Sequence, residues 1–110
     1  MAFAGLGHVS RTQLNWRIHL ALGCIAIGMG LALGLPWFEW ALLVATIGTV
    51  LALEAMNTAL EATVDAIPGP PTSTTRRAKD VAAAAVLISA LAALVVGLVL
   101  FLPKLLALIR

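Results

Sequence analysis

Four polar residues recur along one apolar stretch in the middle of the sequence. Glu54, Asn57, Glu61 and Asp65 are three or four positions apart, the interval at which side chains share one face of an α-helix. On a helical wheel they occupy a stripe roughly 80° wide, and the opposite face is apolar. Acids that face lipid at the bilayer centre each cost about 2.5–3.5 kcal/mol. We therefore expect the stripe to face protein, water or a cation.

These residue types suit chemistry on a phosphate group. A carboxylate in partly dry surroundings is a candidate general base. Acids also suit Mg²⁺, which usually takes one or two protein carboxylates together with phosphate oxygens and water. A basic cluster of Arg76, Arg77 and Lys79 follows the stripe and ends at Asp80, and its cations can hold phosphates. Acids, a metal and a Lys/Arg cluster are the parts that phosphoryl transfer requires.

The same residues also have structural interpretations. Asp80 can be the N-terminal cap of a helix, Asp65 can be a solvated helix end, and Asn57 can form a hydrogen bond between helices. The two arginines of the basic cluster can act only as topology signals. The two histidines, His8 and His19, have no metal-ligand spacing, and we interpret both as interfacial residues.

The composition excludes an ordinary soluble domain. Of the 110 residues, 62% are hydrophobic and 11% are charged, against roughly 25% charged in soluble domains. A soluble domain this small cannot bury so much apolar surface, and disordered chains are poor in apolar residues. Cys24 is the only cysteine, so no disulfide framework exists. No basic run interleaved with aromatics supports nucleic-acid binding. We predict an integral membrane protein with a single domain, residues 1–110.

The apolar stretches predict an all-α membrane protein with three transmembrane helices. A span needs about 20 mostly apolar residues, and such runs lie at about residues 20–38, 40–65 and 81–102. Strand-like alternation is absent, and three strands cannot close a barrel. Residues 3–18 mix polar and apolar side chains, which indicates either an amphipathic helix on the membrane surface, our preferred interpretation, or a loose tail. We expect residues 1–37 to be retained rather than cleaved as a signal peptide, because two further spans follow.

Basic residues predict how the chain is oriented. Five of them flank one side of the membrane and two flank the other: Arg11, Arg17, Arg76, Arg77 and Lys79 against Lys104 and Arg110. The positive-inside rule places the N-terminus and a second loop, at about residues 67–75, in the cytoplasm.

The acidic stripe also has a depth in the membrane. Glu54 lies about 21 Å along the helix from Trp40, and Glu61 about 31 Å. The stripe would therefore run from inside the cytoplasmic leaflet to its surface. Such a site can meet a lipid headgroup from the membrane and a soluble reactant from the cytoplasm.

Two central motifs resemble a known family. The segment EAMNTALEATVD (54–65), followed by AKDVAAAAVL (78–87), resembles the small prokaryotic diacylglycerol kinase and undecaprenol kinase family, and NWRIH (15–19) resembles the segment before that family's first span. The resemblance covers about residues 3–105. It implies a homotrimer of three-span protomers with shared active sites in the bacterial inner membrane. It also implies Mg-ATP-dependent phosphorylation of a lipid alcohol, undecaprenol or diacylglycerol, at the cytoplasmic face.

The resemblance assigns catalytic roles to the stripe. Glu54 matches the general base, Asn57 matches a residue of the catalytic stripe, and Asp65 matches another polar member of the site. Removal of the proton by the base would activate the lipid hydroxyl as it attacks the γ-phosphate of ATP.

The resemblance also assigns residues to ATP and to the metal. Lys79, Asp80, Arg17 and Glu61 match residues that bind ATP, and Glu61 also matches a metal ligand. Family members commonly have a second metal-binding glutamate where this chain has Gln13. An amide oxygen can still bind Mg²⁺, but without charge, so we expect lower metal affinity.

Two other classes of function remain open at this point. A small ion- or proton-coupled transporter or channel subunit could use Glu54 as its ion carrier. Small multidrug exporters have a similar length and one intramembrane glutamate, but they have four spans and this chain has three. A structural or regulatory membrane subunit would need neither Glu54 nor Glu61 for more than stability.

Overall fold

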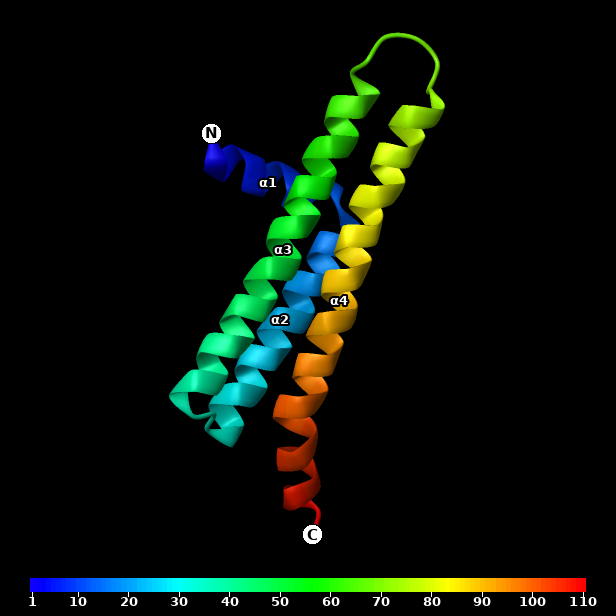
Figure 1. The fold of residues 1–110 in the computed structure, drawn as a ribbon. Helices are drawn as coiled ribbons and strands as arrows, with labels where there is room; N and C mark the ends of the chain where they lie inside the picture. Colours follow the sequence, from blue (N-terminus) through cyan, green and yellow to red (C-terminus); the bar gives the residue numbers. More distant parts are fainter.

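The computed structural model describes residues 1–110 and consists of four helices without any strand. They are α1 (Ala2–Thr12), α2 (Leu14–Leu33), α3 (Trp37–Asp65) and α4 (Ser73–Leu108). The last three are long and apolar enough to cross a membrane. They form an elongated antiparallel bundle from which α1 turns aside (Figure 1), and the whole chain measures 61 × 28 × 21 Å. The predicted all-α architecture, three candidate spans plus a short N-terminal helix, is confirmed.

The N-terminal helix is shorter than the sequence predicted. It ends at Thr12 rather than near residue 18, because Gln13 adopts an extended conformation with φ −112° and ψ 111°. The residues from Leu14 onward belong to α2. Trp16 in the first turn of α2 is buried, and its Nε1 donates a hydrogen bond of 3.1 Å to Ser10 Oγ on α1. The break at Gln13 therefore lets α1 change direction while it stays attached to the bundle.

The turn between α2 and α3 is tight. Gly34 ends α2 with φ 73°, a conformation that favours glycine, and Pro36 caps the start of α3. Trp37 consequently opens α3 instead of lying at the end of the first apolar run. Gly30 allows close packing, since a Cβ there would lie 2.8 Å from the ring of Trp40. Trp40 thus packs against α2, whereas Trp37 is 82% exposed.

Helix α4 begins earlier than the third apolar run. Thr72 caps it: the Thr75 N–H donates to Thr72 Oγ1 at 3.1 Å, and the Thr72 N–H donates to Thr75 Oγ1 at 2.9 Å. This reciprocal capping box satisfies two backbone donors and fixes the start of the helix at Ser73. The suggestion that Asp80 caps the helix is therefore wrong, because Asp80 lies about two turns inside it. The basic cluster before Asp80 is likewise helical.

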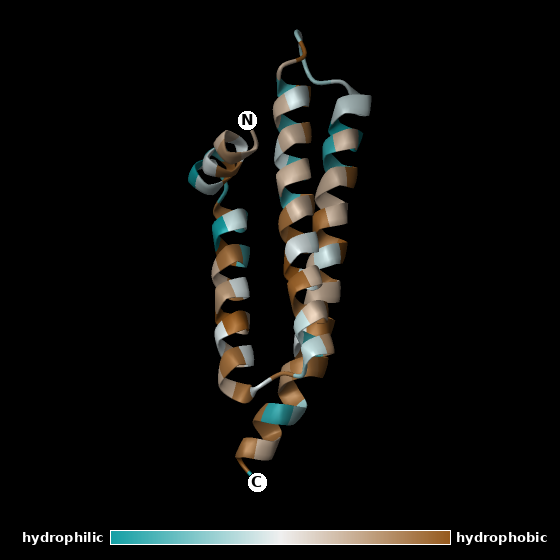
Figure 2. Cartoon of the chain, turned by 90° about the vertical axis from the view of Figure 1, so that its left-hand side faces the viewer, coloured by the Kyte–Doolittle hydropathy of each residue, from teal (hydrophilic) through white to brown (hydrophobic).

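Few side chains are buried in the bundle. Helix α3 packs along α4 and also against α2. The buried apolar cluster lies near the turn end, the end where residues 34–36 join α2 to α3; its members are Leu35, Leu43, Leu100 and Phe101. Figure 2 shows hydrophobic residues along all three long helices and hydrophilic residues gathering towards the loop end, where residues 66–72 join α3 to α4. Lipid tails can cover such outward apolar faces.

Candidate functional site

Glu54 is the buried acid of the bundle. It lies in the middle of α3, is 5% exposed, and is the only buried charged residue. Its Oε1 lies 2.5 Å from Nδ1 of His19 on α2. Its other oxygen, Oε2, is buried without any hydrogen-bond partner. Glu54 therefore faces protein rather than lipid, with one carboxylate oxygen occupied and the other free.

The interpretation of His19 as an interfacial residue did not include its contact with Glu54. Its side chain is 26% exposed and is held against Glu54 between two helices. The sequence contained a signal for this contact. Helices α2 and α3 are joined by a tight turn, so residues equally distant from that turn lie side by side, and His19 and Glu54 are nearly equidistant from it.

Asn57 and Glu61 interact one turn further along α3. Asn57 Nδ2 donates a hydrogen bond of 3.2 Å to Glu61 Oε1. The contact lies within α3, so Asn57 does not make the interhelical hydrogen bond that we considered for it. Its Oδ1 is buried without a partner. The stripe thus presents a second unused oxygen, next to a carboxylate.

Asp65 and Lys79 form the third contact, between α3 and α4. Lys79 Nζ donates to Asp65 Oδ1 at 2.5 Å, and the two side chains are 38% and 65% exposed. A cavity of about 260 Å³ adjoins the pair at the loop end and includes Thr75 and Arg76 in its lining. Exposed ion pairs contribute only about 0–1 kcal/mol. A phosphate group could therefore displace Asp65 from Lys79 at small cost.

Other residues assigned by resemblance are not brought together within this chain. Arg17 and Asp80 are exposed, and no hydrogen bond or ion pair involves either side chain. The Gln13 side chain is half-buried and also unpaired. No group of three or more His, Cys, Asp or Glu residues lies close enough to hold a metal ion. The candidate site of one chain therefore consists of three separate side-chain contacts along the half of α3 that is nearer the loop end.

The oxygen atoms on α3 fit a hard cation. Mg²⁺ prefers oxygen ligands and usually takes one or two carboxylates, with phosphate and water completing its shell. Glu61 supplies a half-buried carboxylate, and the unpartnered Oδ1 of Asn57 lies on the residue that is bonded to it. This donor set suits Mg²⁺ bound together with ATP phosphates rather than a cage made by the protein alone.

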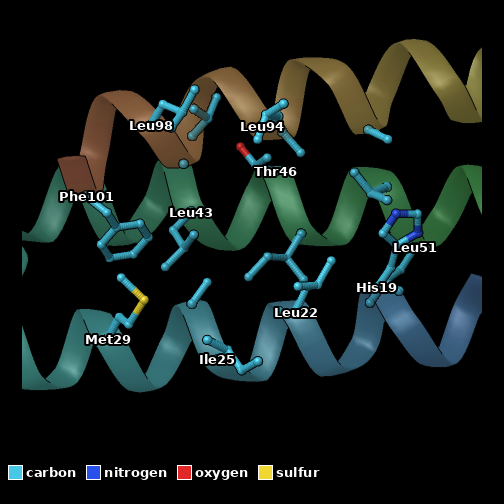
Figure 3. Close-up of a pocket in the computed structure, with 18 residues that line it drawn as sticks. His19, Leu22, Ile25, Met29, Leu43, Thr46, Leu51, Leu94, Leu98 and Phe101 are labelled. Atoms are coloured by element: carbon cyan, nitrogen blue, oxygen red, sulfur yellow. The ribbon is translucent and has the colours of Figure 1, made fainter.

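An apolar groove of about 460 Å³ runs between α2, α3 and α4. Fourteen of its 18 lining residues are hydrophobic. Phe101 and Met29 lie at the end nearer the turn, and His19 lies at the opposite end (Figure 3). The groove therefore has room for an apolar chain and ends at the imidazole that contacts Glu54.

Comparisons with known proteins identify the family of the chain. A family model described as prokaryotic diacylglycerol kinase matches residues 1–101. An undecaprenol kinase of Bacillus subtilis (strain 168) is 38% identical over 101 residues, which is 92% of this chain and 82% of that protein. A diacylglycerol kinase of Synechocystis is 43% identical over 108 residues, which is 97% of this chain but 62% of that protein. The chain belongs to the prokaryotic diacylglycerol kinase family.

Proposed function

We propose that this protein transfers the γ-phosphoryl group of ATP to the hydroxyl of a membrane lipid alcohol, undecaprenol or diacylglycerol. Membership of the family identifies the chain as a lipid kinase, and the matched relatives are an undecaprenol kinase and a diacylglycerol kinase. Nothing in the comparisons supports the transporter alternative.

One observation supports this function most directly: the unpartnered Oε2 of Glu54. A buried polar atom without a hydrogen bond costs roughly 1–3 kcal/mol of stability. A bound ligand that donates a hydrogen bond to Oε2 would remove this cost. Oε2 belongs to Glu54, which is 5% exposed, and the partner of Glu54, His19, lines a groove that fits an apolar chain. Glu54 would accept the hydroxyl proton of the lipid, as a general base requires.

The remaining polar residues would serve the nucleotide and its metal. Lys79 would exchange Asp65 for a phosphate, with Asp80 and Arg17 as further nucleotide contacts. Mg²⁺, when bound, would neutralise charge on the phosphates. Glu61 would hold it beside the amide oxygen of Asn57, and Gln13 would add an uncharged oxygen ligand. Asp65, released from Lys79, would stay at the edge of the nucleotide site.

We further propose that the protein acts as a homotrimer whose protomers share active sites. Within one chain Glu54 contacts His19 rather than Lys79, and no three metal-binding side chains converge. A neighbouring protomer could supply the missing groups, and the exposed apolar faces leave room for one. Co-expression of Glu54→Gln with Lys79→Met tests this idea at limiting ATP. Shared sites should restore activity that each variant lacks alone, whereas an inactive mixture would mean that each protomer works independently.

The protein would reside in the bacterial inner membrane with its N-terminus and loop end in the cytoplasm. The excess of basic residues at these segments supports this orientation. ATP is then available at the loop end, where Lys79 lies. A cysteine-labelling test, with single cysteines placed in the loop at residues 66–72 and in the turn at residues 34–36, should label only the turn from outside intact cells.

A side-by-side lipid assay tests the proposed reaction. Membranes containing the protein should transfer labelled phosphate from ATP to undecaprenol or diacylglycerol in the presence of Mg²⁺. Transfer to neither lipid by the folded protein would contradict the proposal. Ion flux in proteoliposomes without ATP would instead favour the transporter.

A further inference from the structure

His19 is the only side chain that forms a hydrogen bond with the carboxylate of Glu54. The Nδ1···Oε1 distance is 2.5 Å, and the exposed fractions of the two side chains are 26% and 6%. The contact joins the start of α2 to the middle of α3, and His19 lies at the end of the apolar groove (Figure 3). Neither the family description nor the relatives' names assign a role to this histidine.

The contact fixes which atom carries the hydrogen when Glu54 acts as a base. An ionised carboxylate is only an acceptor, so the hydrogen between the two groups must then belong to Nδ1 of His19. A neutral imidazole with its hydrogen on Nδ1 has an acceptor at Nε2. His19 would therefore donate to Oε1 and could not take a proton from that side.

We propose that His19 is the positioning residue of the general base, an inference that rests on the proposed kinase function. A carboxylate has two equivalent oxygens and rotates about its last bond. The hydrogen bond from Nδ1 to Oε1 stops that rotation and leaves Oε2, the buried oxygen without a partner, as the proton acceptor. Holding a catalytic group within a fraction of an ångström of its working position is worth large factors in rate.

The groove supports the same assignment. His19 and Thr46 are the two residues with polar side chains among those that line it. The Thr46 hydroxyl is used within its own helix, where it donates to the carbonyl of Leu42 at 2.7 Å. The polar end of the groove is therefore His19. A lipid alcohol whose apolar chain occupies the groove would bring its hydroxyl to the His19–Glu54 pair.

The atoms and charges of the phosphoryl transfer balance without any proton given or taken by His19. The lipid oxygen forms a bond to the γ-phosphorus while its hydrogen passes as a proton to Glu54 Oε2. The bond between the γ-phosphorus and the bridging oxygen breaks, and ADP leaves with the electron pair. The proton on Glu54 returns to water before the next cycle. His19 keeps its Nδ1 hydrogen throughout, so it is a positioning residue and not a catalytic one.

Three substitutions at one position test the geometry. His19→Leu removes the donor and should lower kcat about 100-fold while the KM for ATP stays near its wild-type value. His19→Asn should retain most of the activity, because its amide nitrogen takes the place of Nδ1. His19→Gln should behave like the leucine variant, because its amide nitrogen lies one bond further out. His8→Leu, at the exposed second histidine, is the matched control and should leave turnover unchanged.

The outcomes separate this inference from the proposed function. Wild-type turnover in His19→Leu, or equal losses in the leucine and asparagine variants, would overturn the positioning role while the kinase function stands. Absence of lipid phosphorylation by the wild-type protein would instead remove the function itself.

A measurement on the wild-type protein covers the case in which the variants do not fold. The ¹⁵N NMR spectrum of imidazole-labelled protein in lipid nanodiscs should show a hydrogen on Nδ1 of His19. An Nδ1 without hydrogen would overturn the inference.

Discussion

Glu39 and Glu54 are two of the acids on α3 that contact basic side chains on neighbouring helices, yet their surroundings differ in one respect. At the turn end, Glu39 Oε1 accepts from Lys104 Nζ at 2.6 Å, and the same ammonium donates to the carbonyl of Leu100 at 2.9 Å. No atom of that pair is buried without a partner. In the half of α3 nearer the loop end, Glu54 Oε1 lies 2.5 Å from His19 Nδ1, but Glu54 Oε2 is buried without a partner. Asn57 Oδ1 is also buried without a partner.

This difference offers a criterion that separates an acid with a structural role from an acid with a functional role. A buried polar atom that is left unpaired lowers stability, so a satisfied pair is consistent with a purely structural role. The Glu39–Lys104 contact fastens the start of α3 to the end of α4 beside the apolar cluster. The Glu54–His19 contact fastens α3 to α2 but leaves Oε2 unpaired, and we propose that a ligand meets this oxygen. We expect substitutions at the two acids to affect different properties.

The largest expected effect comes from Glu54→Gln compared with Glu39→Gln. Removing the proposed general base should lower turnover by about 10²–10⁴-fold, because the amide cannot accept the lipid proton. The Glu39 variant should keep its activity. Turnover of both variants is measured in the same membranes, with gel filtration and thermal unfolding as folding checks. Equal losses of activity in the two variants would remove the distinction between the two ends.

A smaller effect is expected for Lys79→Met, at the loop end. Losing a hydrogen bond from a charged group to a phosphate costs roughly 1.5–3 kcal/mol, so the KM for ATP should rise about 10–100-fold. Arg77→Met, on a neighbouring exposed cation of the same helix, is the control and should change the KM far less. Steady-state kinetics at varied ATP provides the comparison. A KM unaffected by Lys79→Met would take this lysine out of the nucleotide site.

Stability, rather than activity, should change at the turn end. Glu39→Gln or Lys104→Met should each lower the free energy of unfolding by about 1–3 kcal/mol, because the other charge loses its partner in a half-buried place. The double variant should lose less than the two single losses combined. Thermal unfolding in detergent gives these values. A simple addition of the single losses would mean that the pair contributes nothing as a pair.

The smallest effect is expected for Gln13→Glu. A carboxylate in place of the amide adds a charge to the candidate metal ligands, so half-maximal activity should need severalfold less Mg²⁺. Glu61→Gln removes a charge and should shift the Mg²⁺ requirement in the opposite direction. Titration of activity with Mg²⁺ at saturating ATP distinguishes the two. An unchanged requirement in Gln13→Glu would place residue 13 outside the metal site.

The helical architecture could be predicted from the sequence, because each membrane helix is specified by its own run of apolar residues. Long apolar runs identify candidate spans, and the spacing of Glu54, Asn57, Glu61 and Asp65 puts them on one face whatever the helix packs against. The ends of the helices were harder to predict. The extended backbone at Gln13 and the capping box of Thr72 and Thr75 moved two boundaries by several residues, since caps depend on local hydrogen bonds that the apolar pattern does not reveal.

The contacts between helices were not predicted from the sequence. His19 looked like an isolated histidine, and nothing marked Glu39 and Lys104 as partners across 65 residues. Which side chains meet depends on the register between helices, and that register is set by the turn at residues 34–36 and by close packing such as that of Gly30 against Trp40. The sequence by itself determined that acids would line one face of a membrane helix. Only the tertiary structure decided which of their oxygens are hydrogen-bonded and which remain unpaired, because hydrogen bonds between helices form only when both helices are in place.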